Sequence, residues 1–292
     1  MIRTLLFVPG SRRSMIEKAS ASAADAVCLD LEDSVAPDQK PAARAIIVDA
    51  LRQLDFGPRL RILRINGLDT PFAYRDLIDV VEAAGDRLDL VMLPKAGRPE
   101  DVAFVDILLS QMGAAHIGIE AQVETAAGFL YAREIARSSP RLRALIFGPG
   151  DYSASLHMPS SSIGEFDAND ELYPGHRWHA VMHTIVAAAR ANSLRAMDGP
   201  FAAFRDPAGF ERSCRIARAM GFDGKQCIHP AQLETANAIF SPSPEEIAHA
   251  ERILAAYDEA MAAGRGAVSL DGRMIDAANI RMARVTLNKE KP

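Results

Sequence analysis

Eight short, mostly apolar runs recur along the chain, separated by stretches that are long enough for helices. We predict strands at residues 2–8, 26–31, 61–65, 88–93, 116–119, 144–147, 194–197 and 225–228. Most of these runs lack strict alternation of apolar and polar residues, which is typical of parallel strands covered on both faces. Helix start signals follow several of them, at Asp38, Thr70-Pro71 and Arg98-Pro99. Eight β-α units in one chain predict an α/β fold of the closed (β/α)₈ TIM barrel type.

The main alternative is a doubly wound open sheet, which normally has fewer strands. No glycine-rich dinucleotide fingerprint follows Val8, which disfavours that fold. We therefore expect residues 1–240 to form the barrel. Residues 152–177 are too polar and too long for an ordinary loop, and are predicted to be a lid, a subunit contact or a surface insertion without function. Residues 241–292 are predicted to form the last helix and a C-terminal extension that packs on a neighbouring subunit.

Composition excludes several classes of protein. Hydrophobic residues make up 49% of the chain and charged residues 24%, so the chain can bury a core and is not disordered. No apolar run approaches the roughly 18–20 residues of a membrane helix. A net charge of −5 argues against a nucleic-acid partner. The first apolar run is too short for an export signal, and three scattered cysteines suit a reducing compartment, so we predict a cytoplasmic protein.

Polar residues follow the predicted strands, where the reactive groups of a barrel lie. They are Asp30, Glu32, Asp33, Arg64, Asn66, Lys95, Glu120, Gln122, Glu124, Asp151, Asp198 and His229. Carboxylates gathered at one mouth repel one another unless a cation lies among them, and oxygen ligands favour Mg²⁺ or Mn²⁺. Glu124 and Asp151 form the best pair of ligands, and Arg64 is suited to holding a small carboxylate. The glycines around Pro149 allow close backbone approach, so the Gly150 N–H is a candidate anion contact.

Two other kinds of site have little support. His179 and His183 are four residues apart on a predicted helix, and His176 and His229 lie elsewhere in the chain. Without a His-Glu-x-x-His pattern, solvated or capping histidines are favoured over metal ligands. No Gly-x-Ser-x-Gly nucleophile elbow occurs, which disfavours serine hydrolysis.

Eight segments in the same order carry a resemblance that spans nearly the whole chain. They are LLFVPGSRRSMIEKA, ADAVCLDLEDSVAPDQKPAAR, LRIN, VMLPKA, QVETAAGFLYAREIA, FGPGDYSASL, MGFDGKQCIHPAQLETANAIFSPSPEEIAHAERIL and DGRMIDAANIRMA. Together they resemble the acyl-CoA lyases related to the citrate lyase beta chain, a family that includes malyl-CoA and citramalyl-CoA lyases.

The resemblance implies a (β/α)₈ barrel that uses Mg²⁺ to cleave or form the carbon–carbon bond of a 3-hydroxyacyl-CoA thioester, with a 2-oxo acid and an acyl-CoA as products. It implies metal ligation and substrate binding by Glu124, metal ligation by Asp151, and carboxylate binding by Arg64. Contacts with the CoA thioester are implied for Lys18 and the backbone of Gln226 and Cys227. An acid presented by an adjacent subunit is implied for Asp276, together with a homo-oligomer, either a trimer or a hexamer.

Phe7 stands where some relatives carry tyrosine, and Ser14 where some carry lysine, so the thioester carrier stays open. Three alternatives therefore remain beside the CoA lyase. The first is a citrate lyase beta subunit that acts on a carrier-protein thioester. The second is a metal-dependent aldolase on free 2-oxo acids, and the third is a CoA-binding or scaffold protein without activity.

Overall fold

The computed structural model describes residues 1–159, 163–172, 177–264 and 268–290. The chain divides into two compact units, Ile2–Asn237 and Ala238–Pro292. In the first unit, eight parallel strands close into a barrel in sequence order, with the last strand paired to the first. The strands are β1 Thr4–Pro9, β2 Ala26–Asp30, β3 Leu60–Arg64, β4 Leu90–Leu93, β5 Gly118–Val123, β6 Leu142–Phe147, β7 Arg195–Asp198 and β8 Gly224–Cys227. The predicted (β/α)₈ barrel is confirmed.

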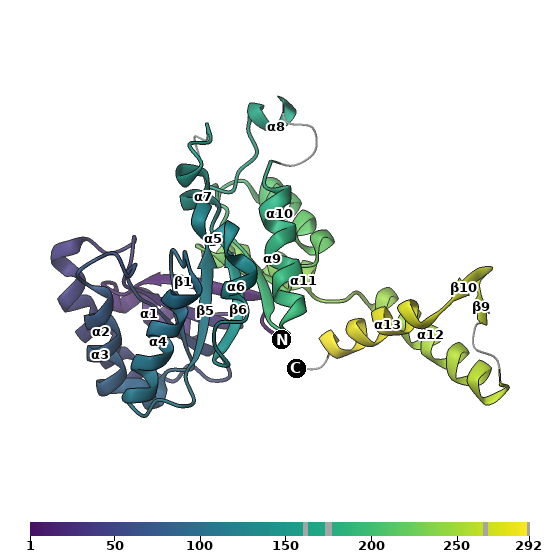
Figure 1. Cartoon of the computed structure of the whole chain (residues 1–292), viewed down its shortest axis with the longest axis horizontal. Coiled ribbons are helices and arrows are strands. Elements are labelled where there is room, and N and C mark those ends of the chain that lie inside the picture. The colour runs from purple at the N-terminus through teal and green to yellow at the C-terminus, as the bar shows by residue number, and fades with distance from the viewer. Residues whose placement is uncertain (160–162, 173–176, 265–267, 291–292) are drawn as a thin grey trace. The chain divides into compact units, whose positions relative to one another are not determined.

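Helices alternate with the strands in the first unit, and Figure 1 shows several of them along the outside of the barrel. They are α1 Arg13–Ser20, α2 Lys40–Gln53, α3 Ala73–Ala84, α4 Pro99–Gln111, α5 Ala126–Leu130, α6 Ala132–Ile135, α7 Pro149–Ser155, α8 Ala168–Leu172, α9 His179–Ala191, α10 Pro207–Met220 and α11 Leu233–Phe240. Local chemistry fixes several starts: α4 begins with Pro99 at its first position, and the Asp206 carboxylate accepts the Gly209 N–H at the start of α10.

The barrel interior holds buried apolar side chains, among them Leu5, Cys28, Ile62, Met92 and Ile146. The outward side chains of the same strands are also buried, because helices cover them. This two-sided burial explains why the strand sequences read as apolar runs without alternation.

The largest difference from the predicted strands is at β5, which runs over Gly118–Val123 rather than residues 116–119. Glu120 and Gln122, predicted to follow the strand, lie within it. They alternate with the apolar residues Ile119, Ala121 and Val123, so their polarity made a strand resemble a loop.

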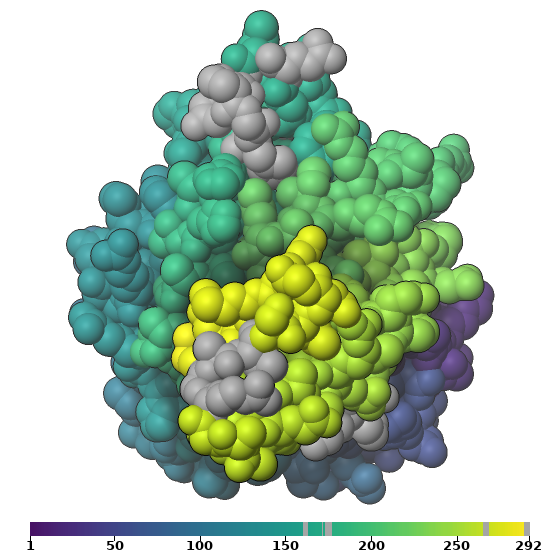
Figure 2. Space-filling view, turned by 90° about the vertical axis from the view of Figure 1, so that its right-hand side faces the viewer, coloured from purple at the N-terminus to yellow at the C-terminus, as the bar shows by residue number. Residues whose placement is uncertain are grey.

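The C-terminal unit has a small core of its own. It contains α12 Pro244–Ala262, a hairpin of β9 Val268–Leu270 and β10 Arg273–Ile275, and α13 Ala277–Glu290. Its buried cluster consists of Ala250, Ile253, Ile275, Ile280 and Ala283. Figure 2 shows α12 in yellow-green and α13 in yellow, packed against each other. Among the described residues, no helix combines the length and apolar character that crossing a bilayer requires.

Glu120, the charged residue within β5, forms an ion pair with Arg195. The Arg195 guanidinium at the start of β7 donates to Glu120 Oε1 at 3.0 Å, and the Glu120 side chain is only 1% exposed. Glu120 Oε2 has no hydrogen-bond partner in the structure. Burial raises the pKa of Glu120, although Arg195 opposes that shift. The pair therefore leaves a charge inside the barrel that depends on its partner.

Replacing Arg195 with Met should lower the free energy of unfolding by about 3 kcal/mol at neutral pH, because it strands the Glu120 carboxylate without its cation. A carboxyl whose pKa is higher in the folded than in the unfolded state binds more protons when folded, so stability rises as the pH falls. The deficit of the variant should therefore shrink between pH 7 and pH 5 in urea titrations. Glu120→Gln combined with Arg195→Met is the control, and a deficit independent of pH and equal in both variants would contradict this account.

Candidate active site

A cavity of about 420 Å³ opens at the carboxyl ends of the strands. Its lining combines charged groups with an apolar rim. The residues are Phe7, Pro9, Met15, Asp30, Asp33, Ser34, Arg64, Gln122, Glu124, Gly148, Pro149, Gly150, Asp151, Ile163, Pro200, Gln226 and Ile228. The structure thus brings together five of the predicted site residues, Arg64, Glu124, Gly150, Asp151 and Gln226.

Arg64, the last residue of β3, is held from three sides. Its Nε and Nη2 donate to the two oxygens of Asp30 at 2.6 and 2.7 Å, and its Nη1 lies 2.7 Å from Glu32 Oε2. The Phe7 ring lies beneath the guanidinium, 4.9 Å from centroid to carbon. Burial opposes the charges of both Arg64 and Asp30, but their mutual attraction raises the pKa of Arg64 and lowers that of Asp30. The guanidinium is therefore a fixed cation at the cavity wall.

Lys95 follows β4 and has a backbone φ of +52°. This left-handed conformation is uncommon for a residue with a side chain and is found at functional sites. It lets the Lys95 N–H donate to Glu124 Oε1 at 2.7 Å. The Lys95 ammonium forms an ion pair with Glu32 and lies 3.8 Å from oxygens of both Asp33 and Asp151.

Glu124 directly follows β5, and its side chain is buried against Gly148. A Cβ atom on Gly148 would lie 2.1 Å from Glu124 Oε2, so only glycine leaves room for the carboxylate. Gln122 Nε2 donates to the same oxygen at 3.2 Å. Burial, together with the nearby charges of Glu32 and Asp151, raises the pKa of Glu124 to about 8. Burial also raises the pKa of Asp151.

The charges of this cluster are not balanced. Five carboxyl groups, those of Asp30, Glu32, Asp33, Glu124 and Asp151, stand against three cations among the described residues, Arg64, Lys95 and Lys40. A divalent cation would offset most of the excess negative charge, and carboxylate oxygens are ligands that Mg²⁺ accepts. In the part of the chain that the structure describes, no three His, Cys, Asp or Glu side chains are grouped around a common metal position. The arrangement therefore fits a Mg²⁺ ion held by Glu124 and Asp151, with water or substrate oxygens at the other positions.

The remaining predicted site residues lie elsewhere. Lys18 is exposed on α1 and does not line the cavity. The Cys227 thiol is buried and also does not line it, although the neighbouring Gln226 does. Asp276 belongs to the C-terminal unit, where its Oδ1 accepts the N–H groups of Ala278 and Asn279 at the start of α13.

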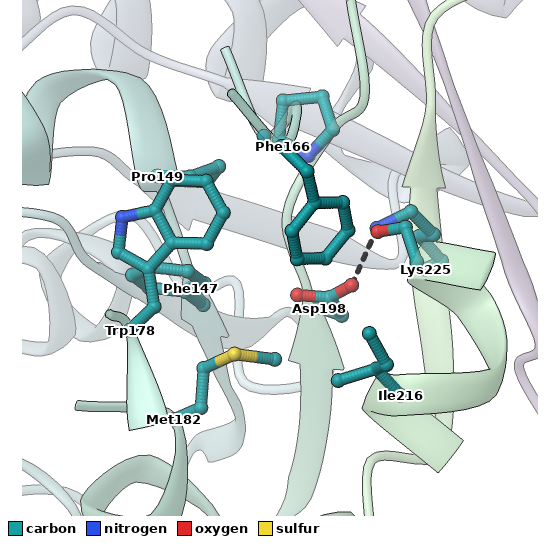
Figure 3. A pocket seen from close by; sticks show the side chains of 11 residues that line it. Phe147, Pro149, Phe166, Trp178, Met182, Asp198, Ile216 and Lys225 are labelled. Carbon is teal, nitrogen blue, oxygen red and sulfur yellow. Dashed lines mark hydrogen bonds and ion pairs between the residues drawn. The ribbon is translucent and has the colours of Figure 1, made fainter. Parts of the chain in front are cut away.

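The prediction that Asp198 belongs to the mouth is wrong. Asp198 is the last residue of β7, and its carboxylate forms a buried ion pair with Lys225 of β8. Ser213 Oγ lies 3.0 Å from the same ammonium. The pair lies beside the aromatic rings of Phe147 and Trp178, as Figure 3 shows, and not in the cavity that holds Arg64. The Asp198 side chain points to the other side of β7, where α10 packs.

The capping role expected of the histidines is confirmed for His229, whose Nδ1 accepts the Ala231 N–H at 3.2 Å. The His229 ring also stacks on Phe204, 4.8 Å between centroids. His179 and His183 are exposed on α9 with rings 4.4 Å apart. His176 lies outside the described residues.

Sequence reasoning missed how the site is held. Asp30, Glu32 and Lys95 were identified only as polar residues after strands, and their pairing with Arg64 and Glu124 depends on barrel closure. Ile163 was not singled out at all. A signal was available for Gly148, because a glycine that follows a strand allows close approach of a neighbouring side chain.

Comparisons with known proteins identify the family of this chain. Residues 3–230 match the model of the HpcH/HpaI aldolase/citrate lyase family. The chain belongs to this family. It is 45% identical to an L-malyl-CoA/beta-methylmalyl-CoA lyase of Cereibacter sphaeroides and 41% identical to a (3S)-malyl-CoA thioesterase of the same species, in each case over 98% of this chain and 94% of the relative. The crystal structure of CitE from Mycobacterium tuberculosis with magnesium, acetoacetate and coenzyme A aligns at a TM-score of 0.80 and 35% identity, covering 98% of this chain and 97% of that one.

Replacing Gly148 with Ala should weaken Mg²⁺ binding by about 10–100-fold, because the new Cβ displaces the Glu124 carboxylate. Titration calorimetry with Mg²⁺ alone measures the change. Gly97→Ala is the matched control, since the nearest atom to its Cβ lies at an ordinary 3.6 Å. Equal Mg²⁺ affinity in Gly148→Ala and the wild type would contradict the role of Glu124 as a ligand.

Proposed function

We propose that this protein is a Mg²⁺-dependent carbon–carbon lyase that cleaves, and in reverse forms, a 3-hydroxyacyl-CoA thioester of the malyl-CoA type. The observation that carries the proposal is the cavity in which the fixed guanidinium of Arg64 lies with Glu124 and Asp151 among excess carboxylates. Support also comes from the family, from the malyl-CoA lyase that is 45% identical, and from the magnesium and coenzyme A bound by the structural relative.

The residues divide the work of this reaction. Glu124 and Asp151 would hold Mg²⁺, which would supply positive charge to stabilise the negative charge that develops on substrate oxygens. Arg64 binds the carboxylate that becomes that of the 2-oxo acid and holds it in one orientation. Loss of the hydroxyl proton converts the carbinol carbon to a carbonyl as the bond to the thioester α-carbon breaks. The electron pair goes to the α-carbon, and the resulting enolate is protonated there to give the acyl-CoA.

Asp276 is our candidate for the group that transfers the proton at the α-carbon. Its carboxylate is exposed in the C-terminal unit, and its hydrogen bonds to α13 fix the local backbone. We propose that Asp276 completes the site of an adjacent subunit in a homo-oligomer, a trimer or a hexamer. This would give the extension after the barrel a catalytic purpose.

The CoA portion of the substrate is proposed to run past Lys18 and the backbone of Gln226 and Cys227. The exposed ammonium of Lys18 suits a phosphate, and Gln226 lies at the cavity wall. A cytoplasmic location suits this chemistry, because CoA thioesters are intracellular substrates and the three cysteines are free and buried.

Hydrolysis of the thioester is the second candidate function. It is favoured by the 41% identity to a (3S)-malyl-CoA thioesterase. The same cavity would then direct water to the thioester carbonyl, with release of free CoA and the hydroxy acid. The two reactions differ in their products and are separable in one assay.

We expect malyl-CoA or citramalyl-CoA to release a 2-oxo acid and an acyl-CoA in the presence of Mg²⁺, and EDTA to abolish the release. A hydrazine reagent detects the oxo acid, and a thiol reagent detects free CoA. Glu124→Ala should reduce release to background while its circular dichroism spectrum stays that of the wild type, because it removes a metal ligand. Free CoA without an oxo acid would favour hydrolysis, and full activity of Glu124→Ala would contradict the proposed ligand.

Two inactive variants should restore activity to each other if the site is shared between subunits. Glu124→Gln disables the barrel and Asp276→Asn disables the tail. A random mixture assembled from both should recover about a quarter of the wild-type activity, the share of sites that join an intact barrel to an intact tail. Light scattering reports the assembly, and an inactive mixture, or a fully active monomer, would contradict the shared site.

A further inference from the structure

Ile163 is the residue of the 152–177 segment that, among the described residues, lines the active-site cavity. It lines the same cavity as Glu124, Gly150 and Asp151, and 44% of it is exposed. Three of its side-chain carbons lie 3.3–3.4 Å from the position that a Cβ atom would take on Gly150. Ile163 therefore packs directly on the turn that carries the proposed metal ligand Asp151.

The backbone fixes this position. Gly164 has a φ of +74°, and a Cβ there would lie 2.2 Å from the carbonyl oxygen of Pro200. The Ala202 N–H donates to the carbonyl oxygen of Ile163 at 3.0 Å. The chain thus passes tightly over the loop after β7, where only glycine fits at the next residue.

The residues that follow are anchored as firmly. Figure 3 shows the Phe166 ring beside the Asp198–Lys225 pair. Its centroid lies 6.3 Å from that of Trp178, and the Arg212 guanidinium covers the ring at 4.6 Å. Arg177, whose side chain is 4% exposed, forms ion pairs with Asp167 and Asp170 at 3.2 Å each. The segment that follows Ile163 is therefore held in place by the packing of Phe166 and the ion pairs of Arg177.

We propose that Ile163 sets the size of the 2-oxo acid that this enzyme cleaves off or condenses. The proposal rests on the proposed function, because it concerns the acid held by Arg64 and the carboxylates. A branched, apolar side chain against the Gly150 turn leaves room for a small substituent next to the oxo carbon. A longer substituent meets the Ile163 side chain, which Gly164 and Pro200 prevent from moving away.

Replacing Ile163 with Ala should shift the preference among 2-oxo acids toward larger ones. In the condensing direction with acetyl-CoA, we expect the ratio of kcat/KM for 2-oxobutyrate over glyoxylate to rise by about 10-fold or more, since excluded methylenes account for selectivities of this size. Activity with glyoxylate should fall only slightly. Ile163→Val should give an intermediate ratio, and thermal unfolding checks that the variants are folded.

Two controls make the result specific to this wall. Ile107→Ala removes an exposed isoleucine from α4, outside the cavity, and should leave the ratio unchanged. Ile228→Ala removes the other isoleucine that lines the cavity. A ratio unchanged in Ile163→Ala, or shifted only in Ile228→Ala, would overturn the proposal.

Failure of the proposed function is distinguishable from failure of this inference. If the wild-type protein condenses none of the acids, the lyase function fails. Calorimetry in Mg²⁺ then measures the dissociation constants of glyoxylate and 2-oxobutyrate. Their ratio compares the preference between the two acids in the wild type and in Ile163→Ala. An unchanged ratio of dissociation constants would overturn the role of Ile163 there as well.

Discussion

The ion pair between Asp30 and Arg64 is the interaction on which the rest of the site depends. It joins the ends of β2 and β3 inside the barrel, with the Asp30 side chain 1% exposed and that of Arg64 12% exposed. Neither charge is stable there alone, because a buried ion that loses its partner keeps its full desolvation cost. Asp30 accepts from Nε and Nη2 of the guanidinium, Glu32 lies 2.7 Å from Nη1, and Phe7 packs on one face. What remains for a ligand is therefore a small part of the fork, in one fixed direction.

Glu124, at the end of β5, is also held in place by its neighbours. A left-handed residue, Lys95, directs a backbone N–H at one carboxylate oxygen, while the missing side chain of Gly148 leaves space for the other. Lys95 follows β4 and Gly148 follows β6, and these strands lie on either side of β5. Barrel closure itself therefore positions Glu124. The cost is a carboxylate with a pKa of about 8, buried near two others. A bound cation removes that cost, which couples the geometry of the site to metal binding.

The sequence predicts the barrel and the main site residues because both follow from strand position. Arg64 and Glu124 stand directly at strand ends, Asp151 lies in the first turn of the helix that follows β6, and their charge was informative there. Asp198 stands at a strand end too, but alternation along β7 turns its side chain to the helices. A shift of one residue along a strand moves a charged side chain to the opposite face of the sheet. The type of residue does not reveal which face its position occupies. Ile163 was not predicted for another reason. Its position depends on the contact of Gly164 with Pro200, which leaves no periodic pattern in the sequence.

The occupancy of the carboxylates explains why a group from outside the barrel is a reasonable proton carrier. Among the described residues that line the cavity, Asp30 is engaged by Arg64, Asp33 lies 3.8 Å from the Lys95 ammonium, and Glu124 and Asp151 are the proposed ligands of the cation. Glu32, beside them, is bound to both Arg64 and Lys95. Arg64 lowers the pKa of Asp30, whereas burial raises the pKa of Glu32, and both carboxylates are held in place by their cationic partners. Asp276 forms no such ion pair among the described residues, and it is exposed in the C-terminal unit. Because the acids of the barrel hold a cation and an arginine, they are consistent with the proposal that an adjacent subunit supplies the acid that moves the proton.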